Sequence, residues 1–401
     1  MIFSKLLFYI LLISSSAQAF ASDKCQSKYQ FSKETSKLPK DINIEKLIGL
    51  TQWPNQENLP IYSILVSYQG KIFYEMYTAD IKENESHAIY SVTKSVVSLL
   101  VGIAKDQGLI KDLNDPITNY LPKEYVTETI KKKFEKITFK NALGMSAINT
   151  EEFPIVKSLN AILNSKNFFL NSNRPQFAVS QQPVLLPGIE FNYSENTMSL
   201  IGAALQNVTK QSLHQYASTH LFKKLDFKND KWLFRDSSGY DMAGYGLKIR
   251  PIDMHKIGVM ILNKGCWNNS QVVSEKWIDE IQTAWIKSAP DKKVSDYGWL
   301  WWHYKFPNGW DSLVAHGRSG QNLVIFPNKE IVISMTGHIN HDEQKTYVFL
   351  KVVKDFIIPA FESSSEKKYN IQQLESALKN VLHSNKNFRA LPEPENAPSE
   401  N

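Results

Sequence analysis

The spacing of apolar positions divides the chain into three parts. Runs rich in β-branched and aromatic residues occur near both ends, at 61–68, 72–77, 298–304, 313–315, 323–326 and 331–335. The first two flank a short turn at Gly70 and predict a β-hairpin. Between the two groups, over about 110–250, apolar residues follow mostly helical spacing. The pattern predicts an α/β (α+β) fold: one antiparallel sheet formed from both chain ends, flanked by helices, with a mostly helical second lobe.

Helices are predicted both inside and outside this lobe. Nearly every residue from Val96 to Ala104 is apolar, which is typical of a helix buried on all sides. Other helical stretches are expected at 116–121, 137–143, 158–164, 196–225, 251–262, 274–285, 344–358 and 371–382. Composition turns polar after Phe361, so we expect one folded domain at 22–361 and a polar C-terminal tail at 362–401, disordered at its end.

The first 21 residues have the pattern of a secretory signal peptide. Lys5 precedes the apolar run 6–13, and small residues that suit cleavage after Ala19 or Ala21 follow. The run is too short to span a bilayer, and no other stretch is long enough, so we expect no stable membrane span after cleavage. The predicted location is the periplasm or the exterior of the cell.

The only cysteines are Cys25 and Cys266. In an oxidising compartment they could pair and close a loop of about 240 residues, which loop-closure arithmetic values at roughly 5 kcal/mol. Spacing alone does not show whether they are close enough.

Composition narrows the class of partner. The chain has 401 residues, of which 42% are hydrophobic and 12% aromatic, as in a globular protein with a sizeable core. Its net charge of +6 is spread among residues of both signs and does not favour nucleic acid.

Ser91 and Lys94 are the first candidates for chemistry. They lie one turn apart at the predicted start of the apolar helix, where unpaired backbone N–H groups can stabilise an oxyanion. A desolvated lysine can act as the base for a serine nucleophile. Its pKa must then fall by about 3 units from ~10.4, and burial beside the apolar helix would act in that direction.

The S-x-x-K spacing is weak evidence by itself. It also occurs at Ser365-Glu366-Lys367-Lys368 and at Ser376-Ala377-Leu378-Lys379, both in the polar tail. The alternative interpretation of Ser91 is a helix cap, with Lys94 in solvent.

Several motifs in order are more specific. They are Gln69–Tyr77, Ser91–Ser95, Gly108–Pro122, Ile137–Ser146, Pro187–Ser194 and Ala315–Gln321. Together they resemble the serine hydrolase superfamily of class C β-lactamases, D-alanyl-D-alanine carboxypeptidases, related esterases and 6-aminohexanoate-dimer hydrolases, over most of 60–360. The resemblance implies the β-lactamase/transpeptidase-like fold and no metal or organic cofactor. It also implies a small-molecule ester, amide or peptide-like substrate.

The resemblance assigns roles to the motif residues. Ser91 would be the acylated nucleophile, and Lys94 and Tyr193 would share the proton that passes from Ser91 to the leaving group. The oxyanion hole would use the Ser91 N–H and a second amide near Ser319, Gly320 or Gln321.

Two departures from the β-lactamase motifs matter. Their Tyr-x-Asn is Tyr193-Ser194-Glu195 here, with Asn196 one position later. Ser194-Glu195-Asn196 also fits the Ser-x-Asn of other penicillin-recognising enzymes, although the Pro-Gly-x-x-Phe-x-Tyr context favours Tyr193. Glu195 thus weakens the case for β-lactam hydrolysis.

The second departure is His316, which stands where the β-lactamases have lysine. Because histidine is only partly charged near neutral pH, Arg318 would instead supply the cation for a substrate carboxylate. Both departures favour an esterase or amide hydrolase.

The aromatic run 299–304 allows two readings. On one strand, Trp299, Trp301 and His303 would share a face, and Trp302 and Tyr304 the other. Core packing is the simpler interpretation, but a face on the cleft would favour apolar or acyl-chain substrates.

Hypotheses from other classes have less support. No G-x-S-x-G motif is complete, and His338, His341 and Asp342 lack a second cluster that would complete a metal site. We therefore predict an exported serine hydrolase that cleaves an ester or amide, like the 6-aminohexanoate-dimer hydrolases or the esterases. The alternatives are a β-lactamase or D-alanyl-D-alanine carboxypeptidase, and a catalytically inactive cell-wall-binding protein on the same fold.

Overall fold

The computed structural model describes residues 25–78, 82–149, 173–287, 295–339, 348–362 and 369–384. The predicted signal peptide, the helix expected at 158–164, His341 and Asp342, and the end of the predicted tail lie outside these residues. None of the helices in the described part is long and apolar enough to cross a membrane.

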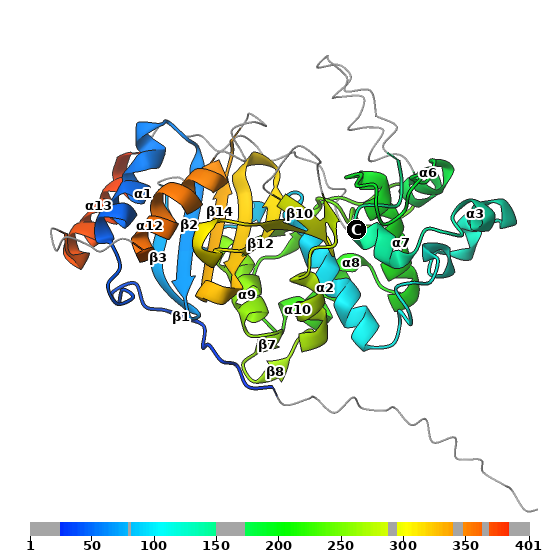
Figure 1. Ribbon diagram of the computed structural model, residues 1–401, viewed down its shortest axis with the longest axis horizontal. Coiled ribbons are helices and arrows are strands. Elements are labelled where there is room, and N and C mark those ends of the chain that lie inside the picture. The colour runs from blue at the N-terminus through cyan, green and yellow to red at the C-terminus, as the bar shows by residue number, and fades with distance from the viewer. Residues whose placement is uncertain are drawn as a thin grey trace, which may run out of the picture.

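A nine-stranded sheet forms the centre of the described structure (Figure 1). Its order is β1-β3-β2-β14-β13-β12-β11-β10-β9, and all neighbours are antiparallel except β1 and β3. The strands are β1 (Ser32–Lys33), β2 (Ile61–Tyr68), β3 (Lys71–Tyr77), β9 (Ile286–Lys287), β10 (Ser295–Gly298), β11 (Trp301–Tyr304), β12 (Ser312–Gly317), β13 (Gln321–Phe326) and β14 (Ile331–Gly337). Because β2 pairs with β14, the prediction of one sheet built from both chain ends is confirmed.

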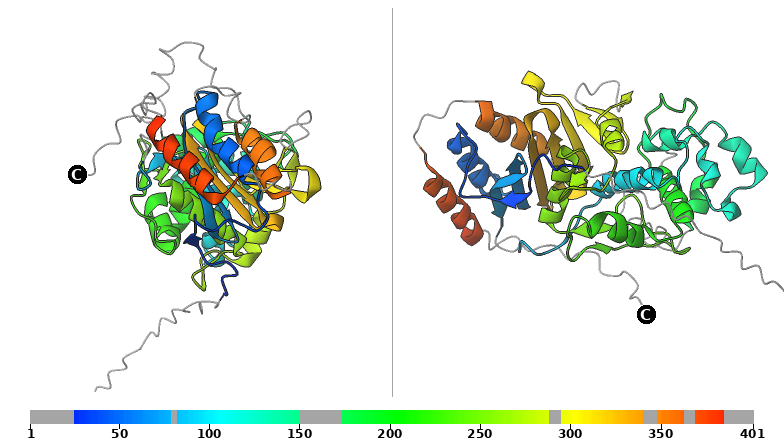
Figure 2. Two further views of the ribbon diagram at one scale, coloured as in Figure 1. Left: turned by 90° about the vertical axis from the view of Figure 1, so that its left-hand side faces the viewer. Right: turned by 90° about the horizontal axis from the view of Figure 1, so that it is seen from below.

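Helices cover both faces of this sheet (Figure 2). On one face, α1 (Ile44–Gln56), α12 (Ile358–Glu362) and α13 (Ile371–Ser384) enclose a core with Ile64, Val324 and Ile333. On the other, α2 (Val92–Asp106), α9 (Pro251–Leu262) and α10 (Glu275–Ile281) pack with Leu323 and Val332. Helix α13 lies beyond the predicted domain end at 361 and packs against α1 and β3.

The remaining helices form the lobe beyond α2, at the end of the molecule opposite α13 (Figure 1). They are α3 (Glu128–Lys133), α4 (Phe139–Leu143), α6 (Arg174–Ser180), α7 (Glu195–Thr209) and α8 (Leu213–Ala217). The stretch predicted at 196–225 is interrupted, because Lys210 adopts a left-handed φ of 56° and Ser212 caps a new helix. Single turns of 3-10 or π helix occur at Ile117–Asn119, Lys123–Tyr125, Ser218–Phe222, Pro307–Gly309, Arg318–Gly320, Pro327–Lys329 and Val352–Ile357.

The aromatic run does not form one strand. Trp299 and Leu300 have φ of 56° and 65° and make the turn between β10 and β11, so Trp299 does not share a strand face with Trp301 and His303. The prediction of a strand over 298–304 is wrong at this turn. The Trp299 ring packs on Trp277 of α10, 5.4 Å between centroids, a tertiary contact that outweighs local strand propensity.

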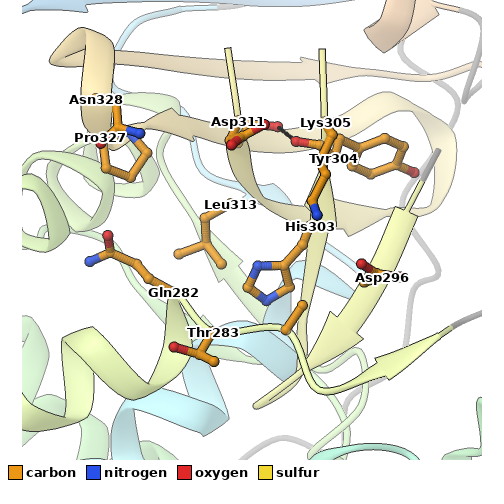
Figure 3. A pocket seen from close by; sticks show the side chains of 12 residues that line it. Gln282, Thr283, Asp296, His303, Tyr304, Lys305, Asp311, Leu313, Pro327 and Asn328 are labelled. Carbon is orange, nitrogen blue, oxygen red and sulfur yellow. Dashed lines mark hydrogen bonds between the residues drawn. The ribbon is translucent and has the colours of Figure 1, made fainter. Parts of the chain in front are cut away.

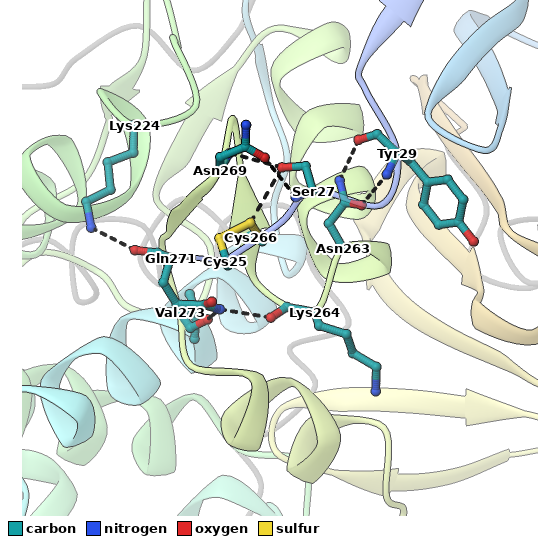
Figure 4. Close-up of a disulfide and its surroundings, with 10 residues drawn as sticks. All are labelled: Cys25, Ser27, Tyr29, Lys224, Asn263, Lys264, Cys266, Asn269, Gln271 and Val273. Atoms are coloured by element: carbon teal, nitrogen blue, oxygen red, sulfur yellow. Dashed lines mark hydrogen bonds between the residues drawn. A yellow bond between two sulfur atoms is a disulfide. The ribbon is translucent and has the colours of Figure 1, made fainter. Parts of the chain in front are cut away.

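Two small sheets attach outer segments to the body. The first joins β4 (His87–Ala88), β6 (Leu247–Ile249) and β5 (Lys231–Trp232), and the second pairs β7 (Cys266–Trp267) with β8 (Ser270–Gln271). Figure 4 shows a disulfide between Cys25 and Cys266, with Cα atoms 5.9 Å apart. Beside it, Tyr29 and Asn263 exchange two hydrogen bonds of 2.8 Å, so the start of the described chain is tied to the body.

Candidate active site

Ser91 lies at the N-terminus of α2, in the position that would cap the helix. The Ser91 hydroxyl makes no capping hydrogen bond. The residue before it, Tyr90, has a left-handed φ of 46°, and Ile89 N–H donates to the Leu247 carbonyl at 3.0 Å. A non-glycine residue in this backbone region carries strain that the surrounding structure must offset.

Lys94 points back from the next turn toward Ser91. Its side chain is only 1% exposed. The Nζ atom donates to Ser91 Oγ at 3.1 Å and to the Gly244 carbonyl at 2.8 Å, and it forms an ion pair with the Glu195 carboxylate. The three hydrogens of an ammonium therefore each have an acceptor. The alternative of a helix cap with Lys94 in solvent does not describe this site.

The expected fall in the pKa of Lys94 is not observed. Burial lowers this pKa and is the largest single influence, but the Glu195 carboxylate and Tyr193 together outweigh it. The pKa of Lys94 is raised above its ordinary value, so the side chain is an ammonium at neutral pH. Burial acts in the direction we expected, but the sequence did not reveal the contact with Glu195 that opposes it.

Glu195 occupies the place beside the lysine, and Asn196 does not. Glu195 is the first residue of α7, and Ser194 caps this helix by accepting from Asn196 N–H at 3.1 Å. Asn196 Oδ1 accepts instead from Arg174 Nη2 at 3.4 Å, in a buried network. The capping bond occupies the Ser194 hydroxyl, which favours the register centred on Tyr193.

A loop glycine makes room for this carboxylate. A Cβ atom on Gly244 would lie 1.7 Å from Glu195 Oε2, so a larger residue there would force the carboxylate to move. The sequence showed Gly244 only as part of a turn. Glu195 was visible as the third residue of the tyrosine motif, but its offset from Tyr193 did not show that it reaches the lysine.

Tyr193 begins an aromatic wall beside the lysine. Lys94 Nζ lies 4.9 Å from the Tyr193 ring centroid. Trp302 stacks on Tyr193 at 5.8 Å with an interplanar angle of 28°, and Phe191 and Tyr297 complete the group. Burial raises the pKa of Tyr297 well above its usual range, and the nearby Tyr193 and Glu195 charges raise it further. Half-buried Trp302 thus joins the site while its neighbour Trp301 packs in the core.

The third motif lies at the end of β12, against the start of α2. A Cβ on Gly317 would come within 2.5 Å of the Ile89 carbonyl, so the strand end and the residues before Ser91 are in close contact. Arg318, Ser319 and Gly320 form the turn into β13, where Ser319 has a φ of 63°.

Side chains of this motif are mostly engaged within it. His316 Nδ1 and Asn322 Oδ1 are 2.6 Å apart, and Gln321 Nε2 donates to the Gly337 carbonyl at 2.6 Å. Gln321 is buried and holds β14 in place, whereas Arg318 is exposed. Only Arg318 and the half-buried His316 thus present side chains at this surface.

A separate hollow of about 390 Å³ lies between the end of α10 and strands β11 and β12 (Figure 3). His303, Gln282 and Leu313 line it, and burial lowers the pKa of His303 to about 4. None of the residues that line it is expected in the active site, so we assign it no part in the chemistry of Ser91.

The fold and this site together define a class. A nine-stranded sheet with a buried, mostly apolar helix on it, and a serine and a lysine in contact at the start of that helix, make a β-lactamase/transpeptidase-like hydrolase fold.

The chain belongs to the beta-lactamase family, whose model matches residues 47–349. The predicted fold and the resemblance to this superfamily are confirmed. The division of the chain at 21 and 361 stays a prediction.

Several of the proteins that this chain resembles are named as hydrolases. The chain is 24% identical to a 6-aminohexanoate-dimer hydrolase of Paenarthrobacter ureafaciens over 285 residues, 68% of this chain and 71% of that protein. A Bacillus anthracis protein assigned as a 6-aminohexanoate-dimer hydrolase has a similar structure, with a TM-score of 0.66 at 17% identity, covering 85% of this chain and 90% of that one. A D-stereospecific amidohydrolase from Streptomyces has a TM-score of 0.60 at 15% identity over 77% and 97% of the two chains. At these identities the solved structures establish the fold alone.

Proposed function

We propose that this protein is an exported serine hydrolase that cleaves an ester or amide bond through an acyl-enzyme on Ser91. The observation that carries the proposal is the 3.1 Å hydrogen bond from buried Lys94 to Ser91 Oγ at a helix N-terminus. A hydroxyl held there is close to backbone N–H groups that stabilise a developing oxyanion.

The proposed reaction has two halves. Ser91 Oγ attacks the carbonyl carbon while the Lys94–Tyr193 pair accepts the hydroxyl proton, and the same pair then donates that proton to the leaving oxygen or nitrogen. Water attacks the ester on Ser91 in the second half, which returns the hydroxyl and releases the acid. The Ser91 N–H and a second amide near Ser319–Gln321 are the proposed oxyanion hole.

The aromatic wall indicates which kind of substrate would fit beside the nucleophile. Trp302 and Phe191 are only partly buried and lie beside Tyr193, which supports an apolar acyl group or linear chain at this side of the nucleophile. Arg318, exposed at the opposite motif, supplies a cation for a substrate carboxylate. Both features suit a small ester, amide or peptide-like molecule, such as the dimer after which the 6-aminohexanoate-dimer hydrolases are named.

Export to the periplasm or the cell exterior is part of the proposal. The disulfide between Cys25 and Cys266 supports it, because such bonds persist in oxidising compartments.

Intact-mass detection of covalent labelling tests the proposal. The mature protein is treated with a fluorophosphonate and, separately, with a penicillin. We expect a fluorophosphonate adduct that is lost in Ser91→Ala. Ser376→Ala is the matched control, because Ser376 has the same spacing to a lysine but is exposed on α13.

The two probes separate the alternatives. An adduct with both probes would favour a β-lactamase or carboxypeptidase, and one with the fluorophosphonate alone an esterase or amidase. Absence of any adduct would refute the proposal and favour the inactive cell-wall-binding protein. In the active enzyme, Tyr193→Phe should lower the turnover rate by about 100-fold or more, as loss of a proton-transfer group does.

A further inference from the structure

Glu195 is a carboxylate in the site for which the proposed reaction gives no role. Its side chain is 32% exposed, whereas the Lys94 side chain that it contacts is 1% exposed. It stands at the third position of the tyrosine motif, where the related β-lactamases have a neutral asparagine. An amide could accept the same hydrogen bond from Lys94 but would add no negative charge.

The contacts of Lys94 show how the negative charge of Glu195 affects the transfer of the Ser91 proton. The groups facing Nζ are Ser91, Tyr193, Glu195 and the Gly244 carbonyl. An ammonium that already donates to three acceptors has no lone pair with which to take the Ser91 proton. The acceptor that remains in the pair is the Tyr193 oxygen.

Groups around Glu195 keep it in this place. Gly244 leaves space for its carboxylate, and Arg174, itself buried, attracts it electrostatically from α6. The negative charge of Glu195 also contributes to raising the pKa of Tyr245 and of Tyr297.

We propose that Glu195 is a positioning residue that keeps Lys94 as an ammonium directed at Ser91 Oγ, so that the proton of Ser91 leaves through the Tyr193 hydroxyl. The proposal rests on the function proposed above. As Ser91 Oγ bonds to the substrate carbon, its O–H bond breaks and the proton bonds to the Tyr193 oxygen. In the same relay the Tyr193 O–H bond breaks, and that proton passes to the leaving oxygen or nitrogen as its bond to carbon breaks. Lys94 keeps its protons throughout.

The first test reads the charge on Lys94 without using catalysis. Protein carrying ¹³C at the lysine Cε is titrated by NMR, with the Lys94 signal assigned by its loss in Lys94→Arg. We expect Glu195→Gln to lower the Lys94 midpoint by about one pH unit or more, because burial remains while the opposite charge is gone. Glu190→Gln is the matched control, because Glu190 lies on the preceding loop outside the contacts of Lys94, and it should leave the midpoint unchanged.

Gly244→Ala provides a second route to the same state. Its Cβ would displace the Glu195 carboxylate without removing any charge from the chain. We expect the Lys94 midpoint to fall as in Glu195→Gln. An identical Lys94 titration in wild type, Glu195→Gln and Gly244→Ala would overturn the proposal.

The second test reads the reaction. The rate of Ser91 acylation by p-nitrophenyl acetate is measured from pH 6 to 11. We expect the alkaline limb of Glu195→Gln to move to lower pH by about one unit or more, and Glu195→Asp to recover part of the shift. A rate lowered equally at every pH would indicate a structural role only and would overturn the proposal. If wild type shows no Ser91-dependent acylation, the proposed function fails, and the NMR titration still decides whether Glu195 controls Lys94.

Discussion

Helices α2 and α9 pack on the same face of the sheet, and each buries a lysine next to a carboxylate. On α9 the partners are local: Asp253 is fully buried and accepts from Arg250 at 2.6 and 2.8 Å, and Lys256 lies 3.1 Å away. On α2 the carboxylate comes from Glu195, 101 residues along the chain, and the lysine also donates to a serine.

The difference between the two clusters indicates which one carries chemistry. Every cation of the α9 cluster is used within the fold, since Lys256 also donates to the Asp226 carbonyl at 2.7 Å. Lys94 instead directs one donor to a hydroxyl that no helix cap requires. Both sites thus bury and pair a charged lysine. The hydrogen bond from Lys94 to the Ser91 hydroxyl is what distinguishes the reactive cluster from the structural one.

Replacing each lysine by alanine should produce opposite results. In Lys94→Ala we expect acylation of Ser91 to fall by about 10³-fold or more, with little change in the unfolding midpoint, because the proton-transfer pair is broken and Glu195 remains partly hydrated. In Lys256→Ala we expect normal acylation but a loss of roughly 1.5–3 kcal/mol, as a charged hydrogen bond is removed. Labelling rates and urea unfolding of both variants check this. Full acylation by Lys94→Ala would contradict the role of the pair.

Removing the central carboxylate of the α9 cluster should be the most damaging change to stability. Asp253→Asn leaves Arg250 and Lys256 buried without their counter-charge, and breaking a buried pair in this way costs about 3–5 kcal/mol. Urea unfolding with a constant slope measures the loss. The Glu195→Gln change should cost far less, because its carboxylate is partly exposed. Equal losses in the two variants would remove the distinction between the clusters.

His255 on α9 offers the smallest test. It is fully buried between the hydroxyls of Ser67 and Ser334, and burial lowers its pKa to about 3. Because the unfolded side chain titrates near 6.5, the unfolded state binds more protons between these values, and stability is lost as pH falls below about 6.5. From pH 7 to 5 this group should remove about 2 kcal/mol. In His255→Gln the decrease in the free energy of unfolding should be smaller by that amount, and an unchanged decrease would contradict the assignment.

Elements with strong periodicity could be predicted, and those fixed by single backbone angles could not. The β2–β3 hairpin and the apolar helix α2 were predictable because their apolar positions repeat over many residues. The break at Lys210 and the turn at Trp299 depend on left-handed φ values at residues that rarely adopt them, for which the sequence has no signal.

In the candidate active site, too, some features could be predicted from the sequence and others could not. Ser91, Lys94 and Tyr193 come together as their motifs suggested. The choice between Glu195 and Asn196 depended on where α7 begins, and the capping bond of Ser194 decides it. The two-residue strand β1 and the space over Gly244 are consequences of tertiary packing, which no local pattern encodes.

The pairing of β2 with β14 also sets the order of events when the protein is made. About 260 residues separate Tyr68 from its partner Ile331. At typical rates of synthesis, roughly 10 to 50 s pass between the appearance of these two residues. During that interval the apolar hairpin has no β14 to pair with, and until β12 and β13 have been made the helix that carries Ser91 lacks the strands on which it packs.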